Sequence, residues 1–126
     1  MKKLTIFQQN DTHGCLEAHD ELYWQGNKPV LKRAGGFARI NQYVKTVKKQ
    51  QKNVLFFDGG DLFHGQLPLV KSQGEAIIPI LKNMELDGFV PGNWDFAYGK
   101  QQLKKLVGEF TFPTLACNVW DSDSKE

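Results

Sequence analysis

Short apolar runs that alternate with helical segments constrain the fold of this chain more than any other feature of its sequence. Four runs have the length and composition of buried strands: residues 4–7, 53–57, 88–90 and 114–119. Between them, apolar residues recur at helical spacing in residues 37–47, 75–84 and 100–107. This alternation predicts an α/β fold with a mostly parallel sheet, right-handed crossovers and flanking helices.

Three segments qualify this pattern. Pro79 falls inside the second predicted helix, so we expect a kink or a late start there. The polar stretch 17–29 carries no strong periodicity and is interpreted as a surface loop. The last residues, 121–126, are polar and are expected to fray as a tail.

Polar clusters follow the first three strands directly. They are residues 11–14 (DTHG), 58–61 (DGGD) and 92–95 (GNWD). In a parallel sheet the carboxyl ends of neighbouring strands open onto one crevice, where ligands bind. Asp, His and Asn supply the oxygen and nitrogen atoms that hard or borderline divalent cations prefer. Three such clusters at successive strand ends favour one shared metal site over coincidence.

Each cluster taken alone also has a plain structural interpretation. If the first strand continues through them, Asp11 and His13 point to the same side and can hold one cation, yet their segment is equally rich in turn-forming residues. The second cluster is also typical of ordinary loops. Within it, Asp61 follows the glycines and is better placed to reach a cleft, whereas Asp58 is expected to hydrogen-bond the turn.

Composition excludes several classes of partner. A net charge of +2 is too weak to indicate nucleic acid or an anionic membrane, and the lysines at 45, 48, 49 and 52 are typical of a solvated helix face. No run approaches the ~20 apolar residues that span a bilayer. The apolar run after Lys3 is too short for a signal peptide, so we expect a cytoplasmic chain.

The two cysteines match no metal or redox spacing. We expect Cys117 to be a buried strand residue and Cys15 to be a plain thiol. A ligand role for Cys15, two residues from His13, is the less favoured alternative.

Taken in order, residues 10–14 (NDTHG), 34–39 (AGGFAR), 58–61 and 92–93 resemble the successive blocks of the 5'-nucleotidase branch of the calcineurin-like metallophosphoesterases. The resemblance extends to about residue 119. It implies that residues 1–120 are the N-terminal half of a four-layer α/β sandwich, followed by the polar tail 121–126. It also implies hydrolysis of a nucleotide or related small phosphoester, as in 5'-nucleotidases and 2',3'-cyclic-nucleotide phosphodiesterases.

The resemblance further implies a site for two divalent cations, of Mn, Zn, Co or Fe. Asp11 and His13 would bind the first cation and Asn93 the second, with Asp61 bridging both. Such a pair of cations clamps a phosphoryl group and lowers the pKa of a bound water.

The third block departs from the family pattern at the acid–base dyad. Relatives carry a His and an Asp where this chain has Trp94 and Ala97, so no catalytic residue is assigned. Residues 94–99 (WDFAYG) locally resemble the thiosulfohydrolase of bacterial sulfur oxidation, which gives an alternative reaction. Trp94 is a candidate substrate contact, with a packed aromatic lining the cleft as the alternative. His64 is a second candidate, although surface packing is favoured for it.

A second departure lies in the histidines. The chain has three, and the Gly-His-x-His block that completes the metal shell of relatives is not among them. His19 is interpreted as a solvated loop residue. We therefore expect a truncated chain with little activity, or a non-catalytic metal-binding fragment, whose exposed surface favours self-association. Relatives are often exported, in contrast to the cytoplasmic location expected here.

Overall fold

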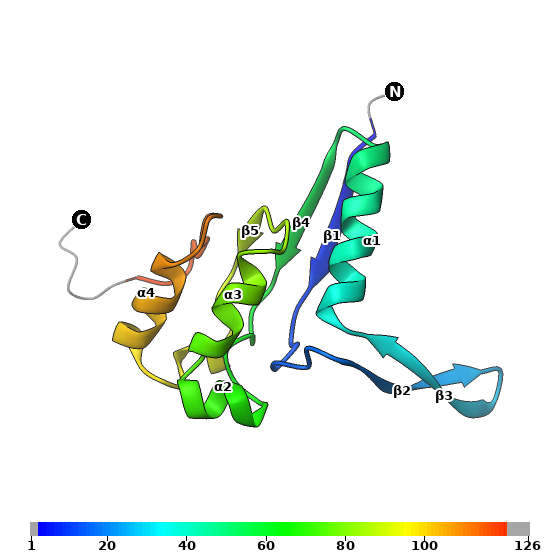
Figure 1. Cartoon of the computed structure of the whole chain (residues 1–126), viewed down its shortest axis with the longest axis horizontal. Coiled ribbons are helices and arrows are strands. Elements are labelled where there is room, and N and C mark those ends of the chain that lie inside the picture. Colours follow the sequence, from blue (N-terminus) through cyan, green and yellow to red (C-terminus); the bar gives the residue numbers. More distant parts are fainter. Residues whose placement is uncertain (1–2, 121–126) are drawn as a thin grey trace.

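The computed structural model describes residues 3–120 and has a three-stranded parallel sheet at its centre (Figure 1). Its strands are β1 (Thr5–Gln9), β4 (Val54–Asp58) and β5 (Gly88–Phe89), in the order β1-β4-β5. Thr5 pairs with Val54 and Gln9 with Asp58, so β1 and β4 end level with each other. The predicted α/β class with a parallel sheet and flanking helices is confirmed, and the strand ends meet at one edge as expected.

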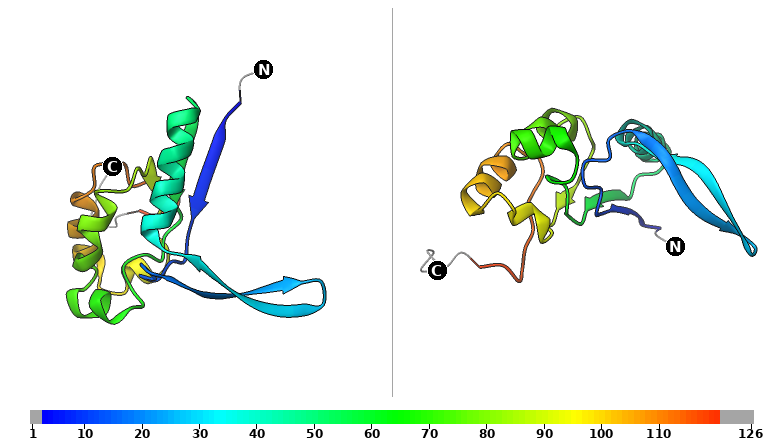
Figure 2. Two further views of the ribbon diagram at one scale, coloured as in Figure 1. Left: turned by 45° about the vertical axis from the view of Figure 1, so that its right-hand side comes forward. Right: turned by 90° about the horizontal axis from the view of Figure 1, so that it is seen from below.

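Helices cover one face of this sheet. They are α1 (Phe37–Gln50), α2 (Leu67–Ser72), α3 (Ile78–Leu81) and α4 (Lys100–Gly108). Each strand is added on the same side of the previous one, so right-handed crossovers place the intervening helices on the same face. The right-hand view of Figure 2 shows α1, α2 and α3 above the strands, and no α-helix of residues 3–120 lies below them.

The helix α1 forms where the apolar spacing predicts it. Phe37 and Val44 are buried against the sheet, and Gly36 precedes the helix with a φ of 88°. Two of its lysines bond the segment before β5: Lys45 Nζ lies 3.4 Å from Asn83 O and Lys48 Nζ 2.8 Å from Asp87 Oδ2. The lysine cluster therefore stabilises the fold in part, besides facing solvent.

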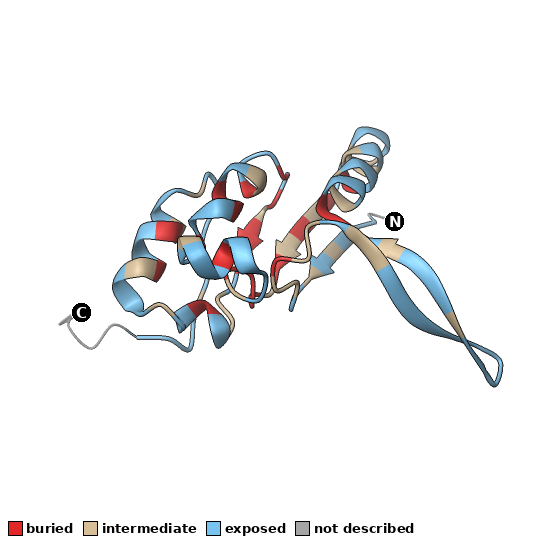
Figure 3. Ribbon diagram, turned by 60° about the horizontal axis from the view of Figure 1, so that its bottom comes forward, coloured by how far each residue is buried: buried red, intermediate tan, exposed pale blue. Residues whose placement is uncertain are grey.

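The core lies between the sheet and the helices (Figure 3). Along β4, Val54, Phe56 and Asp58 are buried and the residues between them are half-buried, which is the alternation of a strand with one covered face. Leu62 and Phe63, in the loop after β4, are fully buried and join this core. The buried side chains of Leu62 and Phe63 therefore fix the loop that carries Asp61 to the core.

The expected surface loop at 17–29 is wrong. Residues 18–35 form an antiparallel hairpin of β2 (Ala18–Gln25) and β3 (Lys28–Gly35), which we call the arm. The arm projects away from the sheet and helices (Figures 1 and 2). Its strands carry polar residues on both faces because neither face packs on a core, so the sequence lacks the apolar alternation of a half-buried strand.

The single helix expected over residues 75–84 is also corrected. The structure has α2, a short 3₁₀ turn at Glu75–Ile77 and then α3. Pro79 occupies the first turn of α3, where its missing N–H has no helical partner to lose, so the proline produces a late start.

The strand expected at 114–119 is reduced to one bridge, between Thr114 and Phe89. Cys117 is exposed in a turn, against the expectation of a buried strand residue. The predicted tail, 121–126, lies outside the described residues. Within residues 3–120 no helix is long and apolar enough to cross a membrane. The cytoplasmic location stays a prediction.

Candidate metal centre

The end of β4 leads into a tight turn that buries the carboxylate of Asp58. Its Oδ1 accepts the backbone N–H of Gly60 at 2.9 Å and its Oδ2 accepts Gln9 Nε2 at 2.6 Å. Burial raises the pKa of Asp58 to about 6, although these two hydrogen bonds favour the charged form. The expectation that Asp58 hydrogen-bonds the turn is confirmed.

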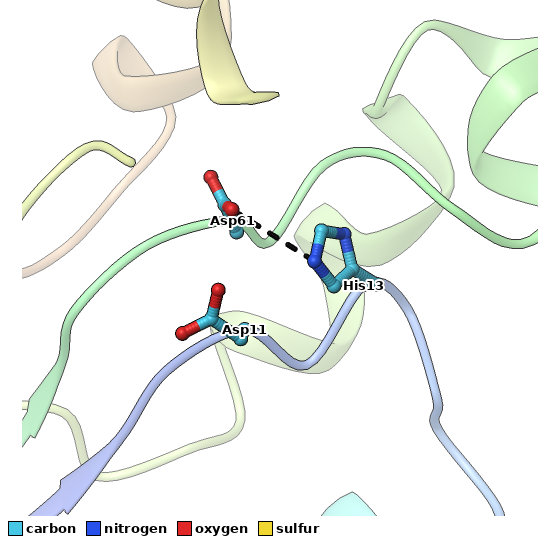
Figure 4. Close-up of side chains that lie close together, drawn as sticks. All are labelled: Asp11, His13 and Asp61. Carbon is cyan, nitrogen blue, oxygen red and sulfur yellow. Dashed lines mark ion pairs between the residues drawn. The ribbon is translucent and has the colours of Figure 1, made fainter. Parts of the chain in front are cut away.

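Asp11, His13 and Asp61 come together at the edge of the sheet where β1 and β4 end (Figure 4). One ligating atom of each lies within 4.8 Å of those of the other two. Backbone hydrogen bonds hold the two loops side by side. The N–H of Asp11 donates to Gly60 O and that of His13 to Asp61 O, both at 2.9 Å. The structure thus brings three of the four predicted metal ligands into one cluster.

The prediction that Asp11 and His13 share one side of a continuing first strand is wrong. The strand β1 ends at Gln9, so both residues lie in the following loop. Their φ angles are 53° and 45°, and that of Asp61 is 55°. Only one other non-glycine residue of the described chain, Gln73, has a positive φ. Asp and His adopt left-handed backbone more readily than most residues with a Cβ, and such residues are concentrated at functional sites.

The two oxygens of Asp61 have different surroundings. Oδ1 accepts the backbone N–H of Trp94 at 2.9 Å, whereas Oδ2 lies 3.8 Å from His13 Nε2. Two ligands of one cation at about 2.1 Å each are no more than about 4.2 Å apart. The 3.8 Å between His13 Nε2 and Asp61 Oδ2 is within that limit. The ligand atoms of all three residues lie within 4.8 Å of one another, so a small movement toward a common centre would let them bind one cation. Two carboxylates and an imidazole are a donor set that suits Mn, Fe, Co and Zn.

The loop that carries Asn93 is packed against the loop that carries Asp61. A Cβ on Gly60 would lie 2.6 Å from Val90 O, and one on Gly92 would lie 2.6 Å from Asp61 N, so both positions exclude a side chain. Asn93 itself is exposed, directly before the Trp94 amide that holds Asp61. Its position beside the cluster is compatible with the predicted second cation.

The sequence interpretation gave no role to Asp95. Its side chain is only 1% exposed and accepts four backbone N–H groups. Oδ2 accepts Asp61 N at 2.9 Å and Gly92 N at 2.8 Å, and Oδ1 accepts Leu62 N at 2.8 Å and Phe63 N at 3.0 Å. The signal for this role was an acid inside a glycine-containing loop at a strand end, which sequence alone does not separate from a solvent-exposed acid.

The predicted substrate contacts form an aromatic cluster. His64 stacks on Trp94 with ring centroids 4.8 Å apart, and Tyr98 lies 5.8 Å from the same imidazole. Trp94 remains 47% exposed, so a large part of its ring is open to a ligand. The chain after His64 contacts the metal cluster, because a Cβ on Gly65 would lie 2.7 Å from His13 Cβ. Ala97 is exposed and brings no acid or base.

The remaining candidates lie elsewhere. Cys15 Sγ accepts Gln66 Nε2 at 3.6 Å and is not one of the clustered ligands. His19, expected to be solvated in a loop, is half-buried on β2. Its ring bonds Glu17 O at 3.1 Å and Glu21 Oε1 at 2.6 Å, and these contacts raise its pKa.

The fold and the cluster together define an α/β protein with a candidate Asp-His-Asp cation site at the carboxyl edge of a parallel sheet. The family model for calcineurin-like phosphoesterases matches residues 4–124. The chain belongs to this family, as its motifs predicted. Metal dependence is a property of the family, and the clustered ligands are the corresponding feature here.

Several relatives are 5'-nucleotidases. The NAD 5'-nucleotidase of Haemophilus influenzae is 29% identical over 93% of this chain and 19% of its own length. The human 5'-nucleotidase is 30% identical over 93% of this chain and 20% of its own. The chain therefore spans about a fifth of the length of these relatives.

Solved structures have the same fold. The structure of the Haemophilus enzyme superposes with a TM-score of 0.80, covering 91% of this chain and 20% of that one. A sulfate thiohydrolase from Thermus thermophilus gives 0.74 at 15% identity, over 92% of this chain and 30% of that one. At that identity the second likeness concerns the fold alone.

Proposed function

We propose that this chain is the N-terminal part of a metal-dependent phosphoester hydrolase of the 5'-nucleotidase or 2',3'-cyclic-nucleotide phosphodiesterase type. The observation that carries the proposal is the convergence of Asp11, His13 and Asp61 at the carboxyl edge of the sheet. Residues 1–120 would form half of the catalytic domain and residues 121–126 a polar tail. The substrate would be a nucleotide or a related small phosphoester.

The ligands divide between two cations in this proposal. Asp11 and His13 hold the first and Asn93 the second. Asp61 bridges them, supported by the Trp94 N–H that occupies one side of its Oδ1. Two bound divalent cations would clamp the phosphoryl group and supply an activated water at neutral pH.

The chain's own residues restrict the leaving group. Trp94 and Ala97 stand where relatives carry an acid–base pair, and an indole N–H cannot shuttle a proton. General acid catalysis contributes about 10²- to 10⁴-fold in rate. A site without it favours substrates whose leaving group needs little protonation. Trp94 stacks on His64 and still leaves a large part of its ring exposed, which would give such a substrate an aromatic contact.

A thiosulfohydrolase-like reaction is the second candidate. It is favoured by residues 94–99, where Trp94 and Tyr98 flank His64 in one aromatic cluster. Cleavage of a sulfur–sulfur bond needs no acid to protonate an alkoxide.

We infer that the 126 residues alone turn over slowly. Of the three histidines, only His13 belongs to the cluster of ligands. His64 is stacked on Trp94 and His19 is bonded to Glu21 on the arm, so neither completes a second cation shell. A third candidate function, cation binding without catalysis, follows if turnover is absent.

The test compares three substrates under three metals. The purified chain is incubated with Mn²⁺, Co²⁺ or Zn²⁺ and with AMP, 2',3'-cyclic AMP or thiosulfate, while calorimetry measures cation affinity in the absence of substrate. Asp61→Asn and an excess of chelator are the controls. We expect cation binding that Asp61→Asn weakens, and slow, metal-dependent release of phosphate from a nucleotide.

Each outcome assigns a function. Thiosulfate cleavage that exceeds both phosphoester activities would replace the first proposal by the second. Binding without turnover of any substrate supports the non-catalytic alternative for these residues. Absence of cation binding would refute the metal centre itself, and rapid nucleotide hydrolysis would refute the inference that these residues are slow.

A further inference from the structure

We infer that Asp95 is a positioning residue, which sets the cation affinity of the site through Asp61 without touching the cation. This inference rests on the metal centre proposed above. It concerns how the centre is held in place, a question separate from which substrate is hydrolysed.

Asp95 accepts a set of hydrogen bonds that fixes the backbone around Asp61. Three of its four donors are the consecutive amides of Asp61, Leu62 and Phe63, at 2.8 to 3.0 Å. Consecutive N–H groups that point at one carboxylate fix the backbone of that segment. They help to hold Asp61 at its φ of 55°, in the left-handed region that residues with a Cβ adopt less often than glycine.

Hydrogen bonds of Asp95 and Asp61 also connect the two loops that carry these residues. Asp95 accepts the amides of the Asp61 loop, and in return Asp61 Oδ1 accepts Trp94 N of the Asp95 loop at 2.9 Å. The fourth donor to Asp95, Gly92 N at 2.8 Å, belongs to the same loop as Asp95. Each loop therefore donates amides to a carboxylate of the other loop. The backbones touch at Gly60 and Gly92, where a Cβ would have no room. Asp95 thus ties the segment of the predicted bridging ligand to the segment of Asn93.

The charge of Asp95 matches its four N–H donors. A buried carboxylate that accepts four N–H groups cannot be replaced by an amide of the same size without loss, because the amide nitrogen would face a donor. Partners that orient metal ligands typically contribute 10- to 100-fold in metal affinity. We therefore expect Asp95→Asn to lower Mn²⁺ affinity at least tenfold.

The test measures Mn²⁺ binding by calorimetry and thermal unfolding by circular dichroism in the full 126-residue chain. The matched control is Asp87→Asn. Asp87 also accepts a backbone N–H, from Phe56 at 2.8 Å, and it bonds Lys48, but it lies outside the ligand cluster. We expect both variants to lower the Tm and only Asp95→Asn to lower Mn²⁺ affinity.

A double variant distinguishes an effect of Asp95 that acts through Asp61 from a direct effect of its charge on the cation. If Asp95 acts through Asp61, adding Asp95→Asn to Asp61→Asn lowers the already weak affinity by less than a further twofold. A full tenfold loss in that background would overturn the inference, because Asp95 would then act on the cation by its own charge. Unchanged affinity in Asp95→Asn alone would also overturn it.

Gly92→Ala serves as a second variant that keeps the charge of Asp95. Its methyl group would collide with Asp61 and push the loops apart. The inference requires a comparable loss of Mn²⁺ affinity, so unchanged affinity in this variant refutes it even if Asp95→Asn fails to fold. If the unchanged chain binds no Mn²⁺, the metal centre fails and the positioning inference fails with it. If the unchanged chain binds and these variants bind equally well, only the positioning inference fails.

Discussion

Asp61 contacts both loops of the candidate site, and its surroundings make asparagine a better test substitution than alanine. It is 6% exposed and bonded to the neighbouring loop, so its place in a loop does not make it dispensable for folding. Alanine would lose the Trp94 hydrogen bond and disfavour the left-handed backbone. Asparagine tolerates that backbone and keeps the acceptor.

We predict that Asp61→Asn lowers Mn²⁺ affinity at least tenfold and shifts the Tm by only a few degrees. Calorimetry and thermal unfolding measure the two effects on the same samples. A variant that keeps full affinity would remove Asp61 from the ligand set.

Asp58 gives the chain a predictable dependence on pH. Its pKa is about 6 in the folded state, above the 3.8 of an unperturbed carboxyl, so the folded state binds the proton more tightly. The contribution of Asp58 to the free energy of unfolding is therefore fully present below about pH 4 and is lost as the pH rises through about 6. A shift of about two units corresponds to about 3 kcal/mol.

We predict that Asp58→Asn reduces the loss of stability between pH 4 and pH 8. The new amide can donate to Gln9 Oε1, which is buried without a partner, once the Gln9 amide is turned over. Urea unfolding at both pH values, in the presence of chelator, measures the difference between the two proteins. Parallel pH profiles for the two proteins would contradict the assignment of the titration to Asp58.

At the scale of elements, the arm is the part of the chain that depends least on the rest. Its two strands pair with each other, and exposed Trp24 and Leu31 show that no core covers it. Its roots are fixed by the bond from Phe37 N to Leu16 O at 2.9 Å. Isolated two-stranded hairpins are marginally stable in water, so the arm contributes little to folding.

We predict that replacing residues 19–34 by two glycines changes the Tm by less than about 5 °C and leaves Mn²⁺ affinity within twofold. Thermal unfolding and calorimetry provide the test. Loss of folding would mean that the arm packs on the sheet in solution.

Which elements could be predicted depends on what each one buries. The helix α1 was predictable because Phe37 and Val44 face a core at helical spacing. The arm was not predictable, because polar residues occur on both faces of its strands and leave no alternation of apolar and polar residues. Its signal was instead Gly26-Asn27, a two-residue turn between paired strands. The three clustered residues Asp11, His13 and Asp61 were predictable from the strand-end clusters. The contacts of Asp95 were not, because it accepts backbone amides, which no side-chain pattern records.

At the scale of the whole molecule, the sheet has one uncovered face. The side chains of β1 alternate, so Phe7 packs beside Tyr43 of α1 while Ile6 is 58% exposed. Parallel sheets are normally covered on both faces. The self-association expected from the sequence, which stays a prediction, would use this surface.

We predict that Ile6→Lys reduces self-association at high concentration, because a charge on the bare face opposes apolar contact. Analytical ultracentrifugation of both proteins is the measurement. A monomeric unchanged chain at every concentration would contradict the prediction.

The projecting arm also has a practical consequence for experiments on this molecule. At its tip, a side chain added to Gly26 would begin with no atom within 4 Å apart from those of Gly26 and the two adjacent residues. At about 3.3 Å per residue, the eight residues of β2 place the tip about 26 Å from the root of the arm. Exposed loop tips tolerate insertion. A fluorophore, affinity tag or surface tether attached there would leave the ligand loops free, and cation binding could be followed on single immobilised molecules.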